Sequence, residues 1–286
     1  AGTLVYTGDG SGFDGTTRVV DGALIVGVGG NGALGGAVEV LNGGVLGGSG
    51  DLGALTVASG GVLKPGNSIG TQSVSGNATF ENGSVFEVEV NNAGSGDRLA
   101  VTGHAFINGG TVNVRAENGT DDGSTYDPAT TYTILTATGG VSGAFSGVTE
   151  NFAFLDAALA YDPDAVLLTL SRNDTDFSEL AKTHNQRVAA IGAQRLGSGN
   201  QLFDAILGLS DAQAPGAFDA ISGEIYGSIR SGFIADSSFL RDAASERVRS
   251  AFGIGVPASA PEFWSMGFGS WQNFSSDGNA AQYTHD

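Results

Sequence analysis

Residues 38–46 read VEVLNGGVL, and residues 55–63 repeat this pattern 17 positions later as LTVASGGVL. A third copy, ATFENGSVF, occupies residues 78–86, and a weaker one surrounds residues 106–114. Each copy contains alternating apolar residues, then a pair with glycine, then apolar residues again, which describes a strand, a turn and a second strand. A unit this short cannot bury its apolar face alone, so neighbouring units must stack on one another.

The repeat predicts a mainly β fold, and the recurring register favours a parallel β-helix in which successive units stack as coils. The alternative is an antiparallel sandwich made of hairpins that turn at the Asn-Gly pairs. The β-helix is favoured over the sandwich because a sandwich does not require the same register to return.

The composition of the chain excludes several classes of function. The 286 residues contain 30 acidic and 12 basic side chains, which gives a formal net charge of −18, and there is no cysteine. Nucleic acid is therefore excluded as an expected partner, because phosphate contacts need clustered Lys and Arg. The absence of cysteine from this sequence excludes a disulfide framework, a thiol nucleophile and a thiolate metal site within it. Apolar runs such as residues 23–28 are far shorter than a membrane helix requires.

The composition changes near residue 172. The first 171 residues contain 35 of the 48 glycines and only 4 of the 12 basic residues, whereas the pattern after residue 173 is helical. We therefore expect β-helix coils over residues 1–60, a cap of the same kind over 61–172, and a helical linker over 173–255. Residues 256–286 are expected to begin a membrane β-barrel that the sequence leaves truncated.

Within the helical part, Asp176 and Glu179 resemble a capping box and predict the start of a helix. Asn200 predicts a second helix start, and residues 222–252 predict a long helix of about 46 Å at the usual rise. The apolar face of the first helix is expected to contain Phe177, Leu180, Ala181, His184, Val188 and Ile191. One side of the long helix is expected to contain Ile225, Ile229, Phe233, Leu240, Ala244 and Val248.

The chain shows little that points to catalysis. Ser68 lies in a G-x-S-x-G pattern, but a nucleophile elbow also needs a following helix, an acid and a histidine, and the neighbouring segments read as strands. Three isolated histidines without cysteine do not predict a zinc site. Asp121 and Asp122 could bind calcium weakly, but their spacing matches no calcium loop. We therefore expect no catalytic residue, no cofactor and no metal.

Residues 63–70, LKPGNSIG, closely resemble the Leu-x-Pro-Gly-x-Ser-x-Gly signature near the end of autotransporter (type V secretion) passenger domains. Further stretches resemble the rest of that region in the family's order, which makes the resemblance more specific than any single motif. These stretches are residues 96–99, 132–137, 141–145, 154–161, 183–186, 209–228 and 263–271.

The resemblance implies a right-handed parallel β-helix, a pertactin-like passenger stem, followed by an α-helical linker and the first strand of an outer-membrane β-barrel. It implies a non-catalytic stem or autochaperone segment, not an enzyme, that nucleates passenger folding and supports display at the cell surface of a Gram-negative bacterium. The implied partners are the protein's own translocator β-barrel, the outer-membrane assembly machinery, periplasmic chaperones and a host-surface ligand. The alternative function is an adhesive or carbohydrate-active (lyase-like) extracellular β-helix.

Two sets of residues are expected to matter for this function. The folding core of the autochaperone region is predicted to contain Leu63, Pro65, Gly66, Ile69, Phe86, Leu99, Tyr132, Phe145 and Leu155. The predicted barrel strand within residues 263–271 contains Trp264, Met266, Phe268 and Trp271. The first three alternate with small residues, as the residues of lipid-facing strands do.

Overall fold

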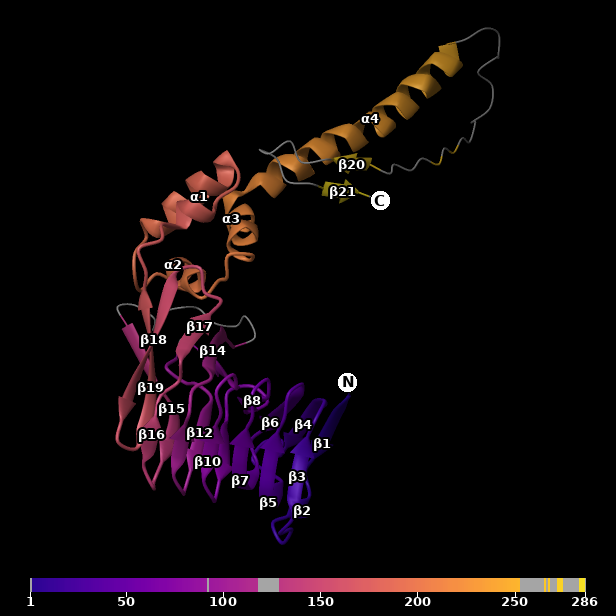
Figure 1. Ribbon diagram of the computed structural model, residues 1–286. Coiled ribbons are helices and arrows are strands. Elements are labelled where there is room, and N and C mark those ends of the chain that lie inside the picture. The colour runs from indigo at the N-terminus through magenta and orange to yellow at the C-terminus, as the bar shows by residue number, and fades with distance from the viewer. Residues whose placement is uncertain are drawn as a thin grey trace. The chain divides into compact units, whose positions relative to one another are not determined.

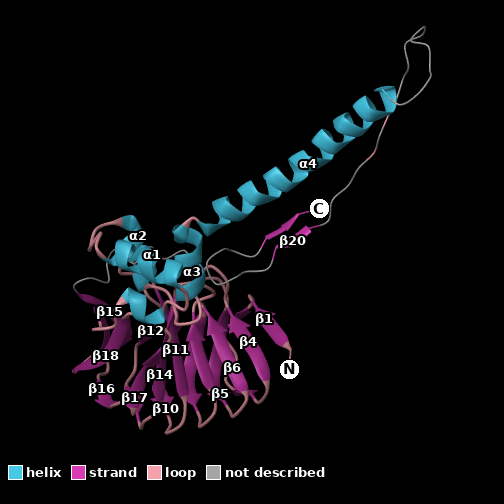
Figure 2. Cartoon of the chain, turned by 90° about the horizontal axis from the view of Figure 1, so that it is seen from above, coloured by secondary structure: helices cyan, strands magenta, loops and turns pink. Residues whose placement is uncertain are grey.

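The computed structural model describes residues 2–91, 93–117 and 129–252, together with residues 265, 267, 272–274 and 283–285. The chain divides into two compact units. The first unit contains Ala1–Phe177 and Ala193–Ala214, and the second contains Ser178–Gly192 and Pro215–Asp286. The strands of the first unit lie side by side in Figures 1 and 2.

One sheet of the first unit has seven strands, and each strand is parallel to its neighbours. In order across the sheet these are β1 (Thr3–Tyr6), β4 (Gly22–Val26), β6 (Gly44–Gly48), β8 (Val62–Pro65), β11 (Val85–Val90), β14 (Thr111–Ala116) and β17 (Gly147–Glu150). Because the strands follow chain order with other strands between them, the chain leaves this sheet and returns to it in the same direction each time.

The intervening strands form a second, twelve-stranded sheet. Most of its pairs are also parallel, including those that join the repeat units. Its members are β2 (Asp9–Gly10), β3 (Thr16–Val19), β5 (Ala33–Val40), β7 (Asp51–Val57), β9 (Thr71–Val74), β10 (Ala78–Phe80), β12 (Arg98–Val101), β13 (Ala105–Ile107), β15 (Ala129–Ala137), β16 (Val141–Gly143), β18 (Leu155–Asp162) and β19 (Ala165–Arg172).

The register places the repeated sequence units directly beside one another. Val38 of β5 pairs with Leu55 of β7, and Leu55 pairs with Ala78 of β10. In the other sheet Leu46 pairs with Leu63, which pairs with Phe86. The predicted mainly β fold with parallel strands is therefore confirmed, and the sequence repeat is also the repeat of the hydrogen-bonded register.

The second sheet departs from a purely parallel arrangement at its C-terminal edge. There β19 pairs antiparallel with both β15 and β18. Only Pro163 and Asp164 connect β18 to β19, and a connection this short joins antiparallel strands, whereas parallel strands need a long crossover. The expectation of parallel coils throughout residues 1–172 is thus wrong for residues 155–172.

Alternate side chains of the parallel strands fill the space between the sheets. The aromatic part of this core consists of Phe80, Phe86 and Phe145, whose ring centroids lie 5.2–5.9 Å apart. Phe80 and Phe86 are fully buried, and Phe145 is 7% exposed. Such closely packed rings contribute both buried area and favourable ring geometry.

Close approach of neighbouring coils makes some glycines indispensable. Gly48 has φ 109°, and a Cβ at this position would lie 2.1 Å from the carbonyl oxygen of Val26. We expect Gly48→Ala to lower the free energy of unfolding by at least about 2 kcal/mol, because strain and collision act together. Urea unfolding of both variants measures this, with Gly147→Ala as the control, since a Cβ there meets nothing within 4 Å. Equal stability of the two variants would contradict the expectation.

The helical elements begin after β19. They are the 3₁₀ turn η1 (Phe177–Leu180) and the helices α1 (His184–Gln194), α2 (Gln201–Leu207), α3 (Ala214–Ser222) and α4 (Glu224–Phe252). The predicted start at Asn200 is confirmed, because its side chain accepts a hydrogen bond from the Leu202 backbone N–H. The sequence patterns did not predict α3.

The first helix starts later than predicted. Asp176 and Glu179 begin only η1, whereas Thr183 and Gln186 form the capping box that starts α1. The Thr183 hydroxyl accepts the Gln186 N–H at 3.1 Å, and the Gln186 side chain accepts the Thr183 N–H at 3.1 Å. This shift moves the buried face to Gln186, Ala190 and Ala193. The predicted apolar face is confirmed at Phe177, which is fully buried, and Leu180 and Ala181 are half-buried. It is wrong for His184, Val188 and Ile191, which are exposed.

The long helix α4 confirms the predicted helix over residues 222–252 to within two residues. Its apolar side is not buried among the described residues, since Phe233, Leu240 and Val248 are 66%, 65% and 54% exposed. The predicted strand over residues 263–271, including Trp264, Met266, Phe268 and Trp271, lies outside the described residues. Farther on, β20 (Gln272–Phe274) and β21 (Tyr283–His285) form an antiparallel pair.

Candidate functional site

The stretch 63–70 folds as the end of β8 and a tight loop that leads into β9. Gly66 has φ 82° and exchanges two backbone hydrogen bonds with Gly48 of the preceding coil, at 2.7 and 3.0 Å. The Asn67 side chain donates to the Gly27 carbonyl at 3.1 Å, and the Gly70 N–H donates to the Asp97 carboxylate at 2.9 Å. The loop is therefore fixed to the coils on both sides of it, which accounts for glycine at 66 and a side-chain donor at 67.

Several charged groups surround this loop and line a cavity of about 240 Å³. The Glu87 carboxylate forms an ion pair with the Lys64 ammonium at 2.5 Å and another with the Arg115 guanidinium at 3.6 Å. Asp97 is 2% exposed, and its two carboxylate oxygens accept the backbone N–H groups of Gly70 and Glu89, each at 2.9 Å. Two facing coils are thus held together through a single buried carboxylate.

Burial dominates the electrostatics of this cluster. Loss of water around Asp97 raises the pKa of its carboxyl from 3.8 to about 7, although the two backbone N–H donors act in the opposite direction. Burial also raises the pKa of Glu89, and repulsion from Glu117 and Glu87 adds to the effect. In contrast, hydrogen bonds from Ser68 and Asn91 lower the pKa of Glu117. A raised carboxyl pKa beside a cavity is a common feature of functional sites, but structural carboxylates show it too.

In the described part of the chain, the hydrogen bond of the Ser68 hydroxyl goes to a glutamate and not to a histidine. This hydroxyl donates to Glu117 at 2.5 Å, and Asn91 donates to the other oxygen of that carboxylate at 3.0 Å. Because these hydrogen bonds stabilise the ionised form of Glu117, the group is a weak proton acceptor. The Ser68 contact reaches from the loop after β8 to the residue after β14, two strands away in the seven-stranded sheet, and the Asp97 contact joins adjacent coils, so this arrangement holds the loop in place.

The predicted folding-core residues lie mostly inside the first unit. Leu63, Pro65, Gly66, Phe86, Leu99, Tyr132, Phe145 and Leu155 are buried, and Ile69 is half-buried. The structure brings Leu63 beside Phe86 and stacks Phe145 on Phe86. Tyr132 lies on β15, and its hydroxyl donates a hydrogen bond to the Asn91 carbonyl at 2.8 Å. Their part in nucleating folding stays a prediction.

A serine–histidine pair that the sequence analysis did not identify lies on the second sheet. The Ser142 Oγ and the His104 Nε2 are 2.7 Å apart, and the His104 Nδ1 lies 2.8 Å from the Gly139 carbonyl oxygen. The carbonyl makes Nδ1 the protonated nitrogen, which leaves Nε2 to accept the serine proton. Parallel pairing of Phe106 with Ser142 creates this contact across 38 positions of sequence, so no local motif could reveal it.

In the part of the chain that the structure describes, no group of three or more Asp, Glu or His side chains is arranged to hold a metal ion. Asp121 and Asp122, considered above for calcium, lie outside the described residues. No helix among the described residues has both the length and the apolar character needed to cross a lipid bilayer.

The fold and these clusters define a mainly β protein with parallel, stacked strands and a helical C-terminal part. No protein-family model matches the chain. It is similar to an "Extracellular serine protease" of Serratia marcescens, with 31% identity over an alignment of 333 residues that covers 99% of this chain. A second "Extracellular serine protease" of the same organism is 28% identical over 256 residues, which cover 72% of the chain. The chain spans 31% and 24% of the length of these curated relatives.

These relatives correct two expectations from the sequence. Both are named as proteases, which contradicts the prediction of a non-catalytic stem and the prediction that no enzyme is involved. The names give no better support to the adhesive or carbohydrate-active alternative. No residue pattern in this chain indicates protease activity, and the chain spans only 31% of the first relative's length. The expected extracellular location agrees with the names of both relatives.

Proposed function

We propose that this chain is a segment of an extracellular serine protease. The observation that carries the proposal is the 31% identity with a secreted protease over 99% of the chain. Similarity that extends through the β part and the helical part together supports a shared arrangement of the whole segment. The protease activity is proposed for the longer protein to which the segment belongs.

We further propose that this protease is an autotransporter and that the first unit is a parallel β-helix. The signature LKPGNSIG supports the first point, since its Gly66, Asn67 and Gly70 make the contacts that fix one coil to the next. The returning parallel register of both sheets supports the second point. Under this proposal the protein's own translocator domain, the outer-membrane assembly machinery and periplasmic chaperones are its partners in export, and the outer membrane is its site of display. A host-surface ligand remains part of the same proposal.

Activity of the full-length protein tests the proposed function. Expressed with its own secretion signals, the protein should hydrolyse a general protein substrate such as casein in the culture medium or at the cell surface. Phenylmethylsulfonyl fluoride should abolish the activity, because it reacts with an activated serine, whereas a metal chelator should not. A full-length protein that is secreted and folded but cleaves no protein substrate would overturn the proposal.

The Ser142–His104 pair can be tested in the same assay. We expect Ser142→Ala to leave the protease activity within about twofold, because His104 is oriented by a neutral carbonyl and not by a carboxylate. In a triad, replacing the carboxylate by a neutral group lowers kcat by about 10⁴. His104→Ala should behave in the same way. Loss of activity in both variants, with unchanged secretion and stability, would assign the nucleophile and the base to this pair.

A further inference from the structure

The Ser142–His104 pair lies on the outer face of the second sheet. Ser142 is exposed on β16, which is the terminal strand of its sheet and pairs with β13 alone among the described strands. The inward positions of β13 are Ala105 and Ile107, which are 0% and 2% exposed. The Ser142 hydroxyl is therefore open to solvent and also hydrogen-bonded to a ring nitrogen of His104 at 2.7 Å.

Three residues fix the position of the His104 ring. Its Nδ1 lies 2.8 Å from the Gly139 carbonyl oxygen, and its centroid lies 4.4 Å from that of the Phe106 ring. Gly140 has φ 104°, and a Cβ at this position would lie 3.3 Å from the His104 Cε1, so glycine leaves the ring its space. The Nε2 atom is therefore held toward Ser142 before any reactant arrives, which is the arrangement that speeds a proton transfer.

The pair is not needed to join its two strands. Three consecutive residues of β13 already pair with three of β16. At the ends of this ladder the Ala105 N–H donates to the Gly140 carbonyl at 3.0 Å, and the Ala144 N–H donates to the Ile107 carbonyl at 3.1 Å. A further hydrogen bond stabilises a protein by only about 0.5–1.5 kcal/mol. What the pair adds is chemical, because it gives an exposed hydroxyl an acceptor for its proton.

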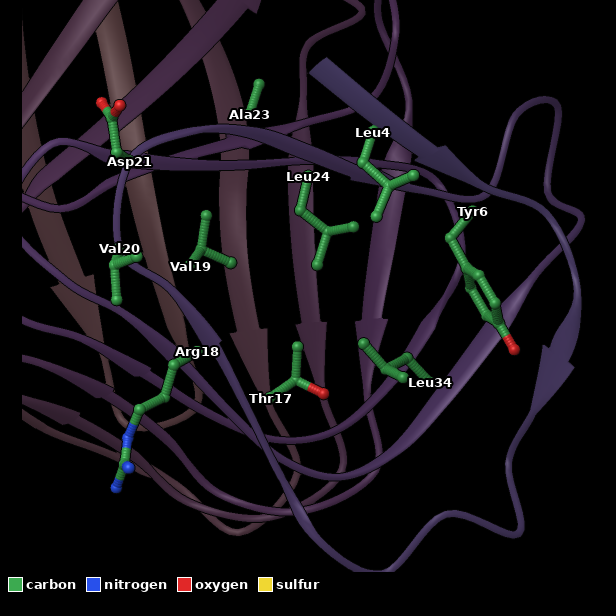
Figure 3. A pocket seen from close by; sticks show the side chains of 10 residues that line it. All are labelled: Leu4, Tyr6, Thr17, Arg18, Val19, Val20, Asp21, Ala23, Leu24 and Leu34. Atoms are coloured by element: carbon green, nitrogen blue, oxygen red, sulfur yellow. The ribbon is translucent and has the colours of Figure 1, made fainter. Parts of the chain in front are cut away.

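An apolar surface adjoins the pair. Phe106 is paired with Ser142, so its ring lies on the same face of the sheet as the hydroxyl, and it is 39% exposed. The cavity drawn in Figure 3 is different, since it is lined by aliphatic side chains such as Leu24 and Leu34 and has no histidine among its lining residues. An apolar surface and a hydroxyl with a base beside it thus occur together at the pair and not at this cavity.

We propose that Ser142 and His104 form an acyl-accepting site, at which small carboxylic esters with a good leaving group acylate Ser142. The Oγ forms a bond to the ester carbonyl carbon, and the His104 Nε2 takes the hydroxyl proton. The leaving alcoholate departs with the electron pair of the broken C–O bond and takes up that proton. Water then attacks the acyl carbon, His104 takes its proton and passes it to the departing Oγ, and a carboxylic acid is released.

The substrate class follows from the group that orients the histidine. A neutral carbonyl stands at the His104 Nδ1, where a catalytic triad has a carboxylate, so the imidazolium that forms during the attack is less stabilised. An ester with a weakly basic leaving group needs less of this stabilisation than an amide, whose nitrogen must be protonated before it departs. Because such a group also departs more readily than the Ser142 alkoxide, acylation is faster than hydrolysis and the acyl form accumulates.

Brief exposure of the full-length protein to p-nitrophenyl acetate tests the proposal, with the acetyl groups located by mass spectrometry. Ser146 is the internal control, because it is exposed as well but both ring nitrogens of His104 are already engaged by Ser142 and Gly139. We expect Ser142 to be acetylated at least about 10²-fold faster than Ser146, since a positioned base contributes about 10²–10⁴. In concentrated urea the two serines should react at equal rates.

A pair of variants identifies the base. His104→Gln should lower the acetylation rate of Ser142 to that of Ser146, whereas His184→Gln, which changes an exposed histidine of α1, should leave it unchanged. Equal acetylation of the two serines in the folded, unmodified protein would overturn the proposal, and this comparison needs no substitution. Unchanged acetylation of Ser142 in His104→Gln would overturn it too. The readout is one serine, so a protein that cleaves no casein but is acetylated at Ser142 would refute the proposed function and leave the acyl-accepting site intact.

Discussion

Phe86→Ala should lower the free energy of unfolding by about 3–5 kcal/mol. The Phe86 ring is fully buried and contacts both Phe80 and Phe145, with ring centroids 5.4 and 5.9 Å away. Removing it leaves a cavity that the two neighbouring rings cannot fill, because each is held by its own strand or by the turn after β16. Urea unfolding followed by far-ultraviolet circular dichroism measures the change.

The matched control is Phe106→Ala. Phe106 is also an aromatic residue on a strand of the first unit, but it is 39% exposed on the outer face. We expect its replacement to cost less than about 1 kcal/mol. A similar loss in both variants would mean that the aromatic rings between the sheets do not form the stabilising centre of this unit.

The second large effect is a dependence of stability on pH that arises at Asp97. The carboxyl has a pKa of 3.8 in the unfolded chain and about 7 in the folded protein. Between these two values the folded protein holds a proton that the unfolded chain has released. Stability contributed by this group is therefore complete below about pH 4 and is lost as the pH rises toward 7, by up to about 4 kcal/mol. The pKa of Glu89 is also raised, so the stability that this group contributes is likewise lost as the pH rises.

Replacing Asp97 with Asn should make the free energy of unfolding decrease less between pH 4 and pH 7. The amide stays neutral at every pH, but its NH₂ group cannot accept a hydrogen bond, whereas each of the two oxygens of Asp97 accepts one backbone N–H, the hydroxyl oxygen of the protonated acid included. We expect Asp97→Asn to be less stable than the unmodified protein at pH 4.5 by about 1–3 kcal/mol and to lose this disadvantage by pH 8. Urea unfolding at several pH values measures both quantities.

Asp9→Asn is the control for this titration. Hydrogen bonds from the Ser11 hydroxyl and N–H lower the pKa of Asp9, so the stability it contributes is lost only as the pH falls below about 4. Replacing Asp9 should leave the decrease in the free energy of unfolding between pH 4 and pH 7 unchanged. If Asp97→Asn also keeps the full slope in that interval, the carboxyl does not hold a proton in the folded protein at neutral pH.

The sequence predicted the repeating part of the fold well because one physical pattern determined it. Copies of the same motif at residues 38–46, 55–63 and 78–86 became parallel neighbours, with Val38 beside Leu55 and Leu55 beside Ala78. The hairpin of β18 and β19 was not predicted, because its direction depends on the two-residue connection at Pro163 and Asp164 and not on apolar periodicity.

The site was harder to predict than the fold. The contact of Ser142 with His104 and the burial of Asp97 both depend on which coil lies beside which, and no local spacing contains that information. The start of α1 was misplaced for a different reason. Two capping patterns lie seven residues apart, and the second one is favoured by the burial of Gln186, whose side chain donates to the Asp219 carboxylate at 2.8 Å. The prediction that no enzyme is involved was overturned by the names of two curated relatives, and no residue pattern in this chain contains that information.

The unequal spacing of coils that still pair in register has a consequence for how such a protein can change. Leu46 and Leu63 are paired neighbours 17 positions apart, whereas the next pair, Leu63 and Phe86, is separated by 23. The additional residues occupy connections outside the sheets, and the interior column is unaffected. The outer surface of each coil can therefore gain or lose segments with little cost to the interior, so that new binding loops can evolve on a scaffold whose interior stays the same.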